Sequence, residues 1–203
     1  MSVVEDKLTK RDIAALSKMH IDSLPDSIIS GFGDRYARAF YRFLANSSKE
    51  MVFVERDPEL GNSIIAACVL SLQSATLKRR LLWRTAWFPV VLLSSYRLLI
   101  KFGSNRASED AGVMQPEGPE IVLIFTCPEL RSRGCGSRLV KRAEQWLTHR
   151  QAKTLYVKTQ EADDNRAIAF YLRMGFSIIG SVSAHGKQLS LLQKRLVGNE
   201  LIR

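Results

Sequence analysis

The chain has 203 residues, of which 46% are hydrophobic and 25% are charged. This size and composition indicate one large domain and exclude wholesale disorder, collagen and coiled coil. Thirty basic residues against twenty acidic ones give a net charge of +10, which favours an anionic partner: a phosphorylated cofactor, an acidic substrate, nucleic acid or a lipid surface.

Cysteine use and the start of the chain bear on its compartment. The three cysteines, Cys68, Cys127 and Cys135, form no CxxC pair, which excludes a disulfide framework and a cysteine-type zinc site. We therefore expect a reducing compartment, the cytoplasm. Residues 1–20 contain acidic residues and no apolar h-region, so we expect neither a secretory signal nor a cleaved transit peptide.

The first third of the chain alternates strand-like runs with helical periodicity. Thr9 stands where a helix N-cap is expected, and apolar residues follow it at the spacing of an amphipathic helix. Pro25 and the Gly31–Gly33 segment break this pattern. The expected elements are a strand over 3–7, helices over 10–22 and 34–46, and strands over 51–55 and 63–71.

The central part of the chain is basic throughout, since residues 61–108 carry seven Lys and Arg and no Asp or Glu. Within it, 77–103 is rich in Leu, Trp and Phe, but only twelve residues separate Arg84 from Arg97, too few for a membrane span of about 20 residues. A proline interrupts the segment, so we expect two short helices, or a helix and an extended piece. We expect it to pack on the domain or on a second copy in a homodimer; the alternative is peripheral contact with an anionic membrane.

From Glu120 onward the pattern is more regular. Residues 121–125 form a continuous apolar run, typical of a strand buried on both faces, and a turn with two glycines leads from it into an amphipathic helix. Gly175 stands where the C′ position of a later helix is expected. The expected elements are a loop over 104–119, a strand over 121–125, a helix after Gly136, a strand over 154–160, a helix that is capped by Asp163 or Asp164 and includes Tyr171, and strands over 176–182 and 188–196.

The turn over 131–136 has the features of an anion site. The first backbone N–H groups of a helix have no partner within it, and the helix dipole adds positive potential, so a diphosphate can bind there without dedicated side chains. Gly134 and Gly136 let the backbone approach the anion, while Arg131 and Arg133 add charge. The spacing matches neither the Walker phosphate loop nor the dinucleotide fingerprint.

This turn is one half of a longer pattern. Residues 131–136 read Arg-x-x-Gly-x-Gly, and about 30 residues later a helix that starts at Asn165 ends in Phe-Tyr-x-x-x-Gly-Phe. Together these segments resemble the acetyl-coenzyme A signature of the GNAT superfamily of N-acetyltransferases. The resemblance is strong over about 120–176 and less specific over 1–72 and 177–196.

The resemblance implies an α/β fold of the acyl-CoA N-acyltransferase type. Such a fold has a mixed, mostly antiparallel sheet of about seven strands with helices on both faces, and its two central parallel strands splay apart so that pantetheine lies in the gap. The order of elements expected above is the order that the resemblance implies. We expect one domain over 1–203 with a helical insertion at about 73–119, where family members usually have a short turn.

The resemblance also implies roles for individual residues, with acetyl-CoA as acyl donor and no metal. Backbone groups near Ile124, Phe125 and Thr126 would meet pantetheine, and Asn165 would reach it from the opposite helix. Tyr171 would stand beside the thioester sulfur and protonate the departing thiolate. The residues that would hold the diphosphate are Arg131, which replaces the glutamine of the strict motif, Ser132, Arg133, Gly134, Cys135, Gly136 and Ser137.

Transfer to an amine also needs a base, because amines are protonated at neutral pH. Glu120, at the start of the buried strand, resembles in its placement the catalytic glutamate of histone-type family members. Glu117 or the Glu109-Asp110 pair could substitute, and a water chain is the alternative to a carboxylate. We do not expect covalent catalysis by Cys135, because no histidine has a spacing that nominates it as the base.

These patterns predict an N-acetyltransferase that transfers acetyl from acetyl-CoA directly to a primary amine. The positive charge favours an anionic acceptor such as an amino-sugar nucleotide, and a protein amine is left open. The alternative is a non-catalytic module of the same fold that binds coenzyme A and docks to a partner or membrane through 77–103. We expect no specific nucleic-acid binding, because zinc-finger and RNA-recognition motifs are absent from the sequence.

Overall fold

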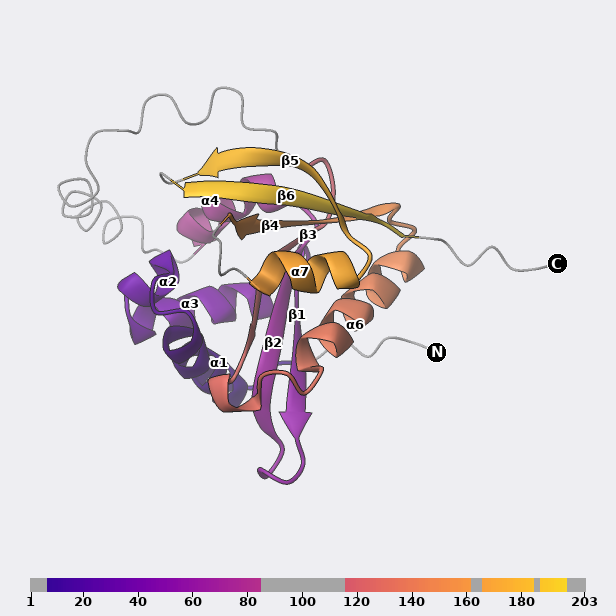
Figure 1. The fold of residues 1–203 in the computed structure, drawn as a ribbon. Helices are drawn as coiled ribbons and strands as arrows, with labels where there is room; N and C mark the ends of the chain where they lie inside the picture. Colours follow the sequence, from indigo (N-terminus) through magenta and orange to yellow (C-terminus); the bar gives the residue numbers. More distant parts are fainter. Residues whose placement is uncertain (1–6, 85–115, 162–165, 185–186, 197–203) are drawn as a thin grey trace.

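Six strands and seven helical segments make up the part of the chain that the structure describes, a computed structural model covering residues 7–84, 116–161, 166–184 and 187–196 (Figure 1). The strands are β1 (Glu50–Asp57), β2 (Ser63–Ser71), β3 (Glu120–Thr126), β4 (Thr154–Gln160), β5 (Ser177–Ala184) and β6 (Lys187–Arg195). The helices are α1 (Lys10–Ser23), α2 (Ile28–Gly31), α3 (Asp34–Ala45), α4 (Ser74–Arg84), the 3₁₀-helix η1 (Pro128–Leu130), α6 (Cys135–His149) and α7 (Arg166–Arg173).

The six strands form one sheet in the order β1-β2-β3-β4-β6-β5. Neighbouring strands are antiparallel except for β3 and β4, which are parallel. These two strands share only two residue pairs, Glu120 with Tyr156 and Ile121 with Val157. Within the described ranges the central strands therefore part almost as soon as they have paired, as the family resemblance implied.

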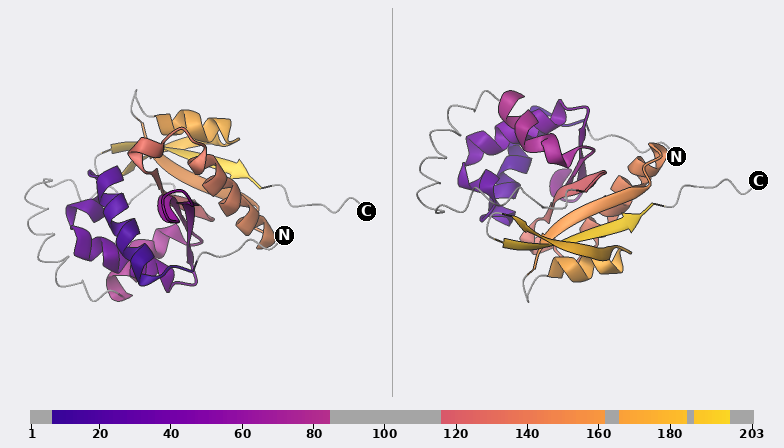
Figure 2. Two further views of the ribbon diagram at one scale, coloured as in Figure 1. Left: turned by 90° about the horizontal axis from the view of Figure 1, so that it is seen from below. Right: turned by 90° about the horizontal axis from the view of Figure 1, so that it is seen from above.

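Helices cover both faces of the sheet (Figure 2). One core lies between the sheet and α6 and α7, and the other lies between the sheet and α1, α3 and α4. Because successive side chains of a strand point to opposite faces, β2 supplies both cores. Cys68 and Leu70 belong to the first core, whereas Ala67 and Val69 belong to the second.

The predicted helices and strands that fall within the described residues are confirmed, with shifts of a few residues at their ends. Asp163 and Asp164, one of which was predicted to cap α7, lie outside the described residues. Thr9 caps α1 as expected: its hydroxyl accepts the N–H of Asp12 at 3.2 Å, and the Asp12 carboxylate accepts the N–H of Thr9 at 2.8 Å. The strand predicted over 154–160 has the bounds of β4. The strand predicted over 3–7 lies almost entirely outside the described residues, so the described sheet has six strands instead of about seven.

The short helix α2 is an element that the sequence pattern does not predict. Pro25 and the glycines on either side of Phe32 interrupt the helical periodicity, but Ser27 caps a single turn between them. The Ser27 hydroxyl accepts the N–H of Ser30 at 3.1 Å. A local cap therefore forms a helix where side-chain periodicity gives no signal.

The described start of the predicted insertion is α4, which is fixed to the sheet by a buried ion pair. The two terminal nitrogens of Arg80 lie 2.5 and 3.2 Å from the carboxylate oxygens of Glu50 on β1. The hydroxyl of Ser71 on β2 donates to the same carboxylate at 3.0 Å. The Glu50 side chain is fully buried, so loss of Arg80 would leave an uncompensated buried charge.

The remainder of the predicted segment 77–103, from residue 85 on, and the predicted loop up to residue 115 lie outside the described residues. The expectation of membrane or dimer contact through this segment therefore stays a prediction. In the described ranges, no helix combines the length and apolar character that crossing a membrane requires.

His20 of α1 is fully buried and joins three elements. Its Nδ1 lies 2.7 Å from the hydroxyl of Tyr41 on α3, and its Nε2 lies 2.9 Å from Oγ of Ser27. Its ring also lies 5.5 Å, centroid to centroid, from that of Phe125 on β3. A neutral imidazole accepts at one nitrogen and donates at the other, so it satisfies both partners. Burial lowers the pKa of His20 to about 4.

We expect the free energy of unfolding to fall as the pH drops from about 6.5 to about 4. In this window the unfolded chain binds a proton at His20, whose ordinary pKa is 6.5, whereas the folded chain does not. The loss should reach roughly 2 kcal/mol at pH 5. Urea denaturation at pH 7 and pH 5 measures it, and in His20→Gln most of this difference should vanish. An unchanged pH dependence in that variant would contradict the assignment.

Candidate active site

The bend between β3 and α6, residues 132–137, carries a run of unpaired backbone N–H groups. On one side of it, the N–H of Arg131 donates to the carbonyl of Pro128 at 3.4 Å. On the other side, the N–H of Arg138 donates to the carbonyl of Gly134 at 3.1 Å. The six N–H groups between them make no hydrogen bond to any described residue. The bend therefore offers six donors to a ligand.

The backbone of the bend has the shape of an anion-binding concavity. Ser132 and Gly134 have left-handed conformations, with φ of +65° and +76°. Backbone in which left-handed residues alternate with residues of other conformations forms a concave anion site, which is called a nest. Gly134 is also the N-cap of α6, so the helix dipole adds positive potential here. Gly136 has a packing role as well, since a Cβ at that position would lie 3.4 Å from the Phe170 ring of α7.

Arginine side chains lie around the bend without covering it. Ser132, Arg133 and Gly134 are exposed. Arg138, in the first turn of α6, donates through Nη1 to the carbonyl of Arg133 at 3.1 Å and through Nε to Glu55 of β1 at 3.1 Å. A groove of about 340 Å³ separates the bend from the β1–β2 turn. Its lining residues are Arg56, Asp57, Pro58, Glu59, Ile65, Arg133, Cys135 and Arg138.

β3 runs into the bend along the edge where it has parted from β4. Ile124, Phe125 and Thr126, which were predicted to meet pantetheine, all lie beyond the last residue pair of the two strands. The side chain of Phe125 packs in the α1/α3 core beside His20, so only its backbone can serve the gap. Backbone groups on this edge lack a partner strand, and an extended ligand can satisfy them.

Tyr171 of α7 is held in place by the end of its helix. The N–H of Phe176 donates to the Tyr171 carbonyl and the N–H of Gly175 donates to the Leu172 carbonyl, both at 3.0 Å, which is a Schellman motif. Gly175 has φ of +84° there, as the sequence predicted for a C′ glycine. The rings of Phe170 and Phe176 lie 5.1 and 5.3 Å from that of Tyr171. This packing fixes the direction of the phenol.

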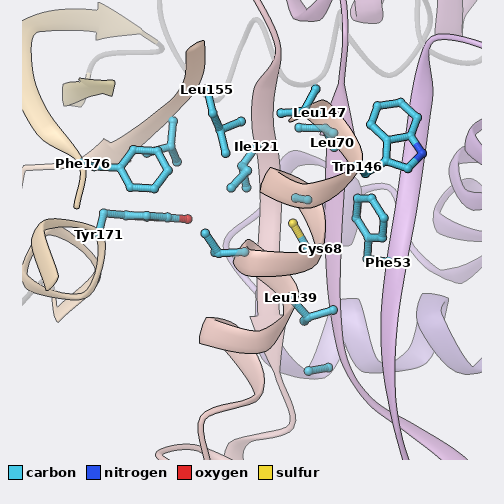
Figure 3. Packing of buried hydrophobic residues seen from close by; sticks show 14 of the residues in the cluster. Phe53, Cys68, Leu70, Ile121, Leu139, Trp146, Leu147, Leu155, Tyr171 and Phe176 are labelled. Atoms are coloured by element: carbon cyan, nitrogen blue, oxygen red, sulfur yellow. The ribbon is translucent and has the colours of Figure 1, made fainter. Parts of the chain in front are cut away.

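The Tyr171 hydroxyl points from α7 toward α6 and Cys68 (Figure 3). The residue is 3% exposed, and no hydrogen bond joins its hydroxyl to another described residue. Burial raises the pKa of Tyr171, and the Cys68 thiol adds a smaller shift in the same direction, so the hydroxyl stays protonated at neutral pH. This oxygen is not among the fully buried polar atoms of the described residues that lack a partner, so it can hydrogen-bond a molecule that enters the gap.

Glu120 begins β3, in the first of the two rungs that join this strand to β4. Its side chain is 7% exposed, and its Oε2 lies 3.4 Å from Nζ of Lys158 on β4. The next residue, Ile121, belongs to the α6/α7 core together with Tyr171, so strand alternation turns Glu120 toward the opposite face. The predicted base and the predicted acid therefore approach the gap from opposite faces of the sheet.

The remaining candidates are not brought together. Cys135 is 2% exposed and its Sγ lies 3.3 Å from Nη2 of Arg138. His149, fourteen residues further along α6, is about 21 Å away by the rise of a helix. His20 is bonded elsewhere, so neither of these described histidines can serve Cys135 as a base. The described residues include no group of three or more His, Cys, Asp and Glu that could hold a metal ion.

Some predicted residues lie elsewhere, and one residue at the gap was missed. Asn165 and the Glu109-Asp110 pair fall outside the described residues, while Glu117 is described and exposed. Sequence analysis did not single out Lys158. The sequence does show a charged residue in a strand whose Leu155 and Val157 point into a core. This pattern does not identify the carboxylate that Lys158 contacts.

The acetyltransferase (GNAT) family model matches residues 17–176 of the chain. A search of curated proteins finds no match.

Solved structures of acetyltransferases share the fold. The ribosomal-protein-S18-alanine N-acetyltransferase from Escherichia coli is 12% identical with a TM-score of 0.57, covering 98% of this chain and 97% of that one. An aminoglycoside 6'-N-acetyltransferase complexed with coenzyme A is 14% identical with a TM-score of 0.62, covering 95% and 94%. An N-acetyltransferase from Staphylococcus aureus Mu50 is 12% identical with a TM-score of 0.59, covering 95% and 97%. At these identities the likeness concerns the fold alone.

Gly175→Ala should lower the free energy of unfolding by about 1 to 2 kcal/mol, because alanine is strained at a left-handed φ. The new Cβ would also lie 3.5 Å from Cε of Lys194. Urea denaturation measures the change. Gly31→Ala is the matched control, since nothing lies within 4 Å of a Cβ there and φ is not positive. Equal losses in the two variants would contradict the role of the left-handed turn behind Tyr171.

Proposed function

The chain belongs to the acetyltransferase (GNAT) family, and from that premise we propose that it is an N-acetyltransferase which moves the acetyl group of acetyl-CoA directly onto a primary amine. Membership of the family makes it an acyltransferase. The aminoglycoside 6'-N-acetyltransferase of similar fold is complexed with coenzyme A, which supports acetyl-CoA as the donor here.

The unpaired N–H groups of the bend carry the proposal. A diphosphate presents several acceptor oxygens and a double negative charge. Six free donors from Ser132 to Ser137, the last three in the first turn of α6, match it in number and sign. Arg131 and Arg133, both exposed at the same bend, add attraction at longer range. We assign the diphosphate of coenzyme A to this bend.

The gap between β3 and β4 is the proposed place of the pantetheine arm. The arm is extended and contains two amides, which suits an unpaired strand edge. Ile124, Phe125 and Thr126 would offer their backbone to it on the way from the gap to the bend. We also propose that Asn165 reaches the arm from the opposite side. The thioester would then lie near the apex of the gap, where the last rung joins the two strands.

In this arrangement the two halves of the reaction use opposite faces of the sheet. The amine nitrogen attacks the thioester carbonyl carbon from the Glu120 side, and the Glu120 carboxylate takes the proton that the nitrogen loses. Negative charge develops on the carbonyl oxygen, where an unpaired N–H of β3 can stabilise it. When the carbon–sulfur bond breaks, the thiolate leaves toward Tyr171, whose protonated hydroxyl donates to it.

The net charge of the chain is the property from which we infer the acceptor. We therefore propose a chemical class of amine and no single compound. The net charge of +10 favours an anionic amine such as an amino-sugar nucleotide over a polyamine, which it would repel. A screen of primary amines by thiol release from acetyl-CoA tests this ranking. The panel should include an amino-sugar nucleotide, spermidine and short peptides with free N-termini or lysine.

Coenzyme A should bind at least 100-fold more tightly than pantetheine, which lacks the diphosphate and the 3′-phosphoadenosine, because only coenzyme A can occupy the bend. Isothermal titration calorimetry compares the two ligands. Similar affinities would contradict the role of the bend.

Glycine variants at two helix N-caps provide a matched control for this measurement. Gly134 caps α6 with φ of +76°, and Gly33 caps α3 with φ of +80°. Alanine is strained at both caps, and more so at Gly33, whose ψ of −179° places it in a region that is almost exclusive to glycine. Only Gly134→Ala should weaken coenzyme A binding, by about tenfold or more, whereas Gly33→Ala should not change the dissociation constant.

Tyr171→Phe should lower turnover by about 100-fold while leaving the affinity for acetyl-CoA nearly unchanged, because the variant removes only the proton donor. The assay is thiol release with the best amine of the screen. Tyr36→Phe, on α3 in the core of the opposite face, is the control and should retain activity. A wild-type chain that binds acetyl-CoA but acetylates no amine would favour a non-catalytic module on the same fold.

A further inference from the structure

The ion pair between Lys158 and Glu120 lies at the apex of the gap. Lys158 is the first residue of β4 after the last pair that joins β4 to β3. It lies two positions after Tyr156, the residue paired with Glu120, so strand alternation puts all three side chains on one face. The lysine thus reaches from β4, just beyond the last rung, to the carboxylate that β3 carries one rung earlier.

This pair is shielded from solvent on both sides. The exposed fractions are 18% for the Lys158 side chain and 7% for the Glu120 side chain, and Nζ lies 3.4 Å from Oε2. A buried carboxylate without its cation would carry an uncompensated charge. Removing the ammonium would therefore favour rotation of the carboxylate away from this position, and a displaced carboxylate is a poorer base.

The two oxygens of the Glu120 carboxylate have different surroundings. Oε2 faces the ammonium of Lys158, whereas Oε1 accepts no hydrogen bond from any described residue. One oxygen is thus anchored and the other is free to take a proton. The fully buried carboxylate of Glu50 differs, because Arg80 and Ser71 occupy both of its oxygens.

We propose that Lys158 is a positioning residue for the base: it holds the Glu120 carboxylate in one orientation, so that Oε1 faces the incoming amine. This inference rests on the proposed function and adds a residue to it. Lys158 does not itself take or give a proton in the reaction. The proposed effect of Lys158 on turnover therefore passes through Glu120.

A double-mutant cycle with the best amine of the screen tests this dependence. Lys158→Met should lower kcat by about tenfold or more, leave the dissociation constant of acetyl-CoA within about twofold, and be largely rescued in Lys158→Arg, which keeps the charge. Glu120→Gln should lower kcat by about 100-fold. The double variant should be no slower than Glu120→Gln, because the lysine has nothing left to position.

Lys194 provides the matched control. It pairs with Glu144 between β6 and α6 at 2.7 Å, with exposed fractions of 22% and 18%, on the α6 side of the sheet. Lys194→Met should lower stability about as much as Lys158→Met does and leave kcat unchanged. A similar loss of kcat in both variants would show that Lys158 has a structural role only and would contradict the positioning role.

The possible failures are distinguishable. If Lys158→Met slows Glu120→Gln by the same factor as it slows the wild type, or leaves the wild-type kcat unchanged, the positioning role is wrong while the transferase assignment stands. If the wild-type chain binds no coenzyme A, or acetylates no amine, the proposed function fails, and the inference fails with it. Unchanged turnover in Glu120→Gln would overturn the assignment of the base and of its positioning residue together.

Discussion

The whole arrangement depends on the early parting of the two parallel strands at the centre of the sheet. Buried backbone groups without partners cost free energy, so neighbouring strands normally pair along their length. Here β3 runs on to Thr126 and β4 to Gln160 although they share only two residue pairs. Their outer edges are paired, β3 with β2 and β4 with β6. The rest of the sheet therefore keeps β3 and β4 apart, and the gap between them stays open.

The open gap brings together groups that are distant in sequence. β3 leads along the gap to the bend, and the free N–H groups of the bend extend the unpaired backbone edge of β3. Glu120 lies one rung before the last closed one, and α7 delivers Tyr171 from the other face. Because the two helical layers pack against opposite faces, a nucleophile and a leaving group can use separate sides of one gap. A sheet with all its rungs closed would have no room for either.

Local sequence predicts the parts of this site whose geometry is local. The bend, the glycine behind Tyr171 and the amphipathic helices each depend on a few consecutive residues, so spacing and glycine positions are enough to find them. The Lys158–Glu120 pair is different, because its members are 38 positions apart and meet only in one register of two parallel strands. Neither strand's own pattern fixes that register. The Ser27 cap of α2 and the hydrogen bond between Ser27 and His20 were missed for a related reason. A single capped turn next to Pro25 is too short to show a helical period of apolar residues.

The central claim is that free backbone N–H groups of the bend receive a diphosphate. Amide proton and nitrogen chemical shifts recorded by NMR during titration with coenzyme A test it most directly. We expect the largest shifts, with amide protons moving downfield, at Ser132 to Ser137. The amide shifts of α1 and α3, on the opposite face, should change little. Binding that leaves these six amides unshifted, or that shifts mainly residues elsewhere, would contradict it.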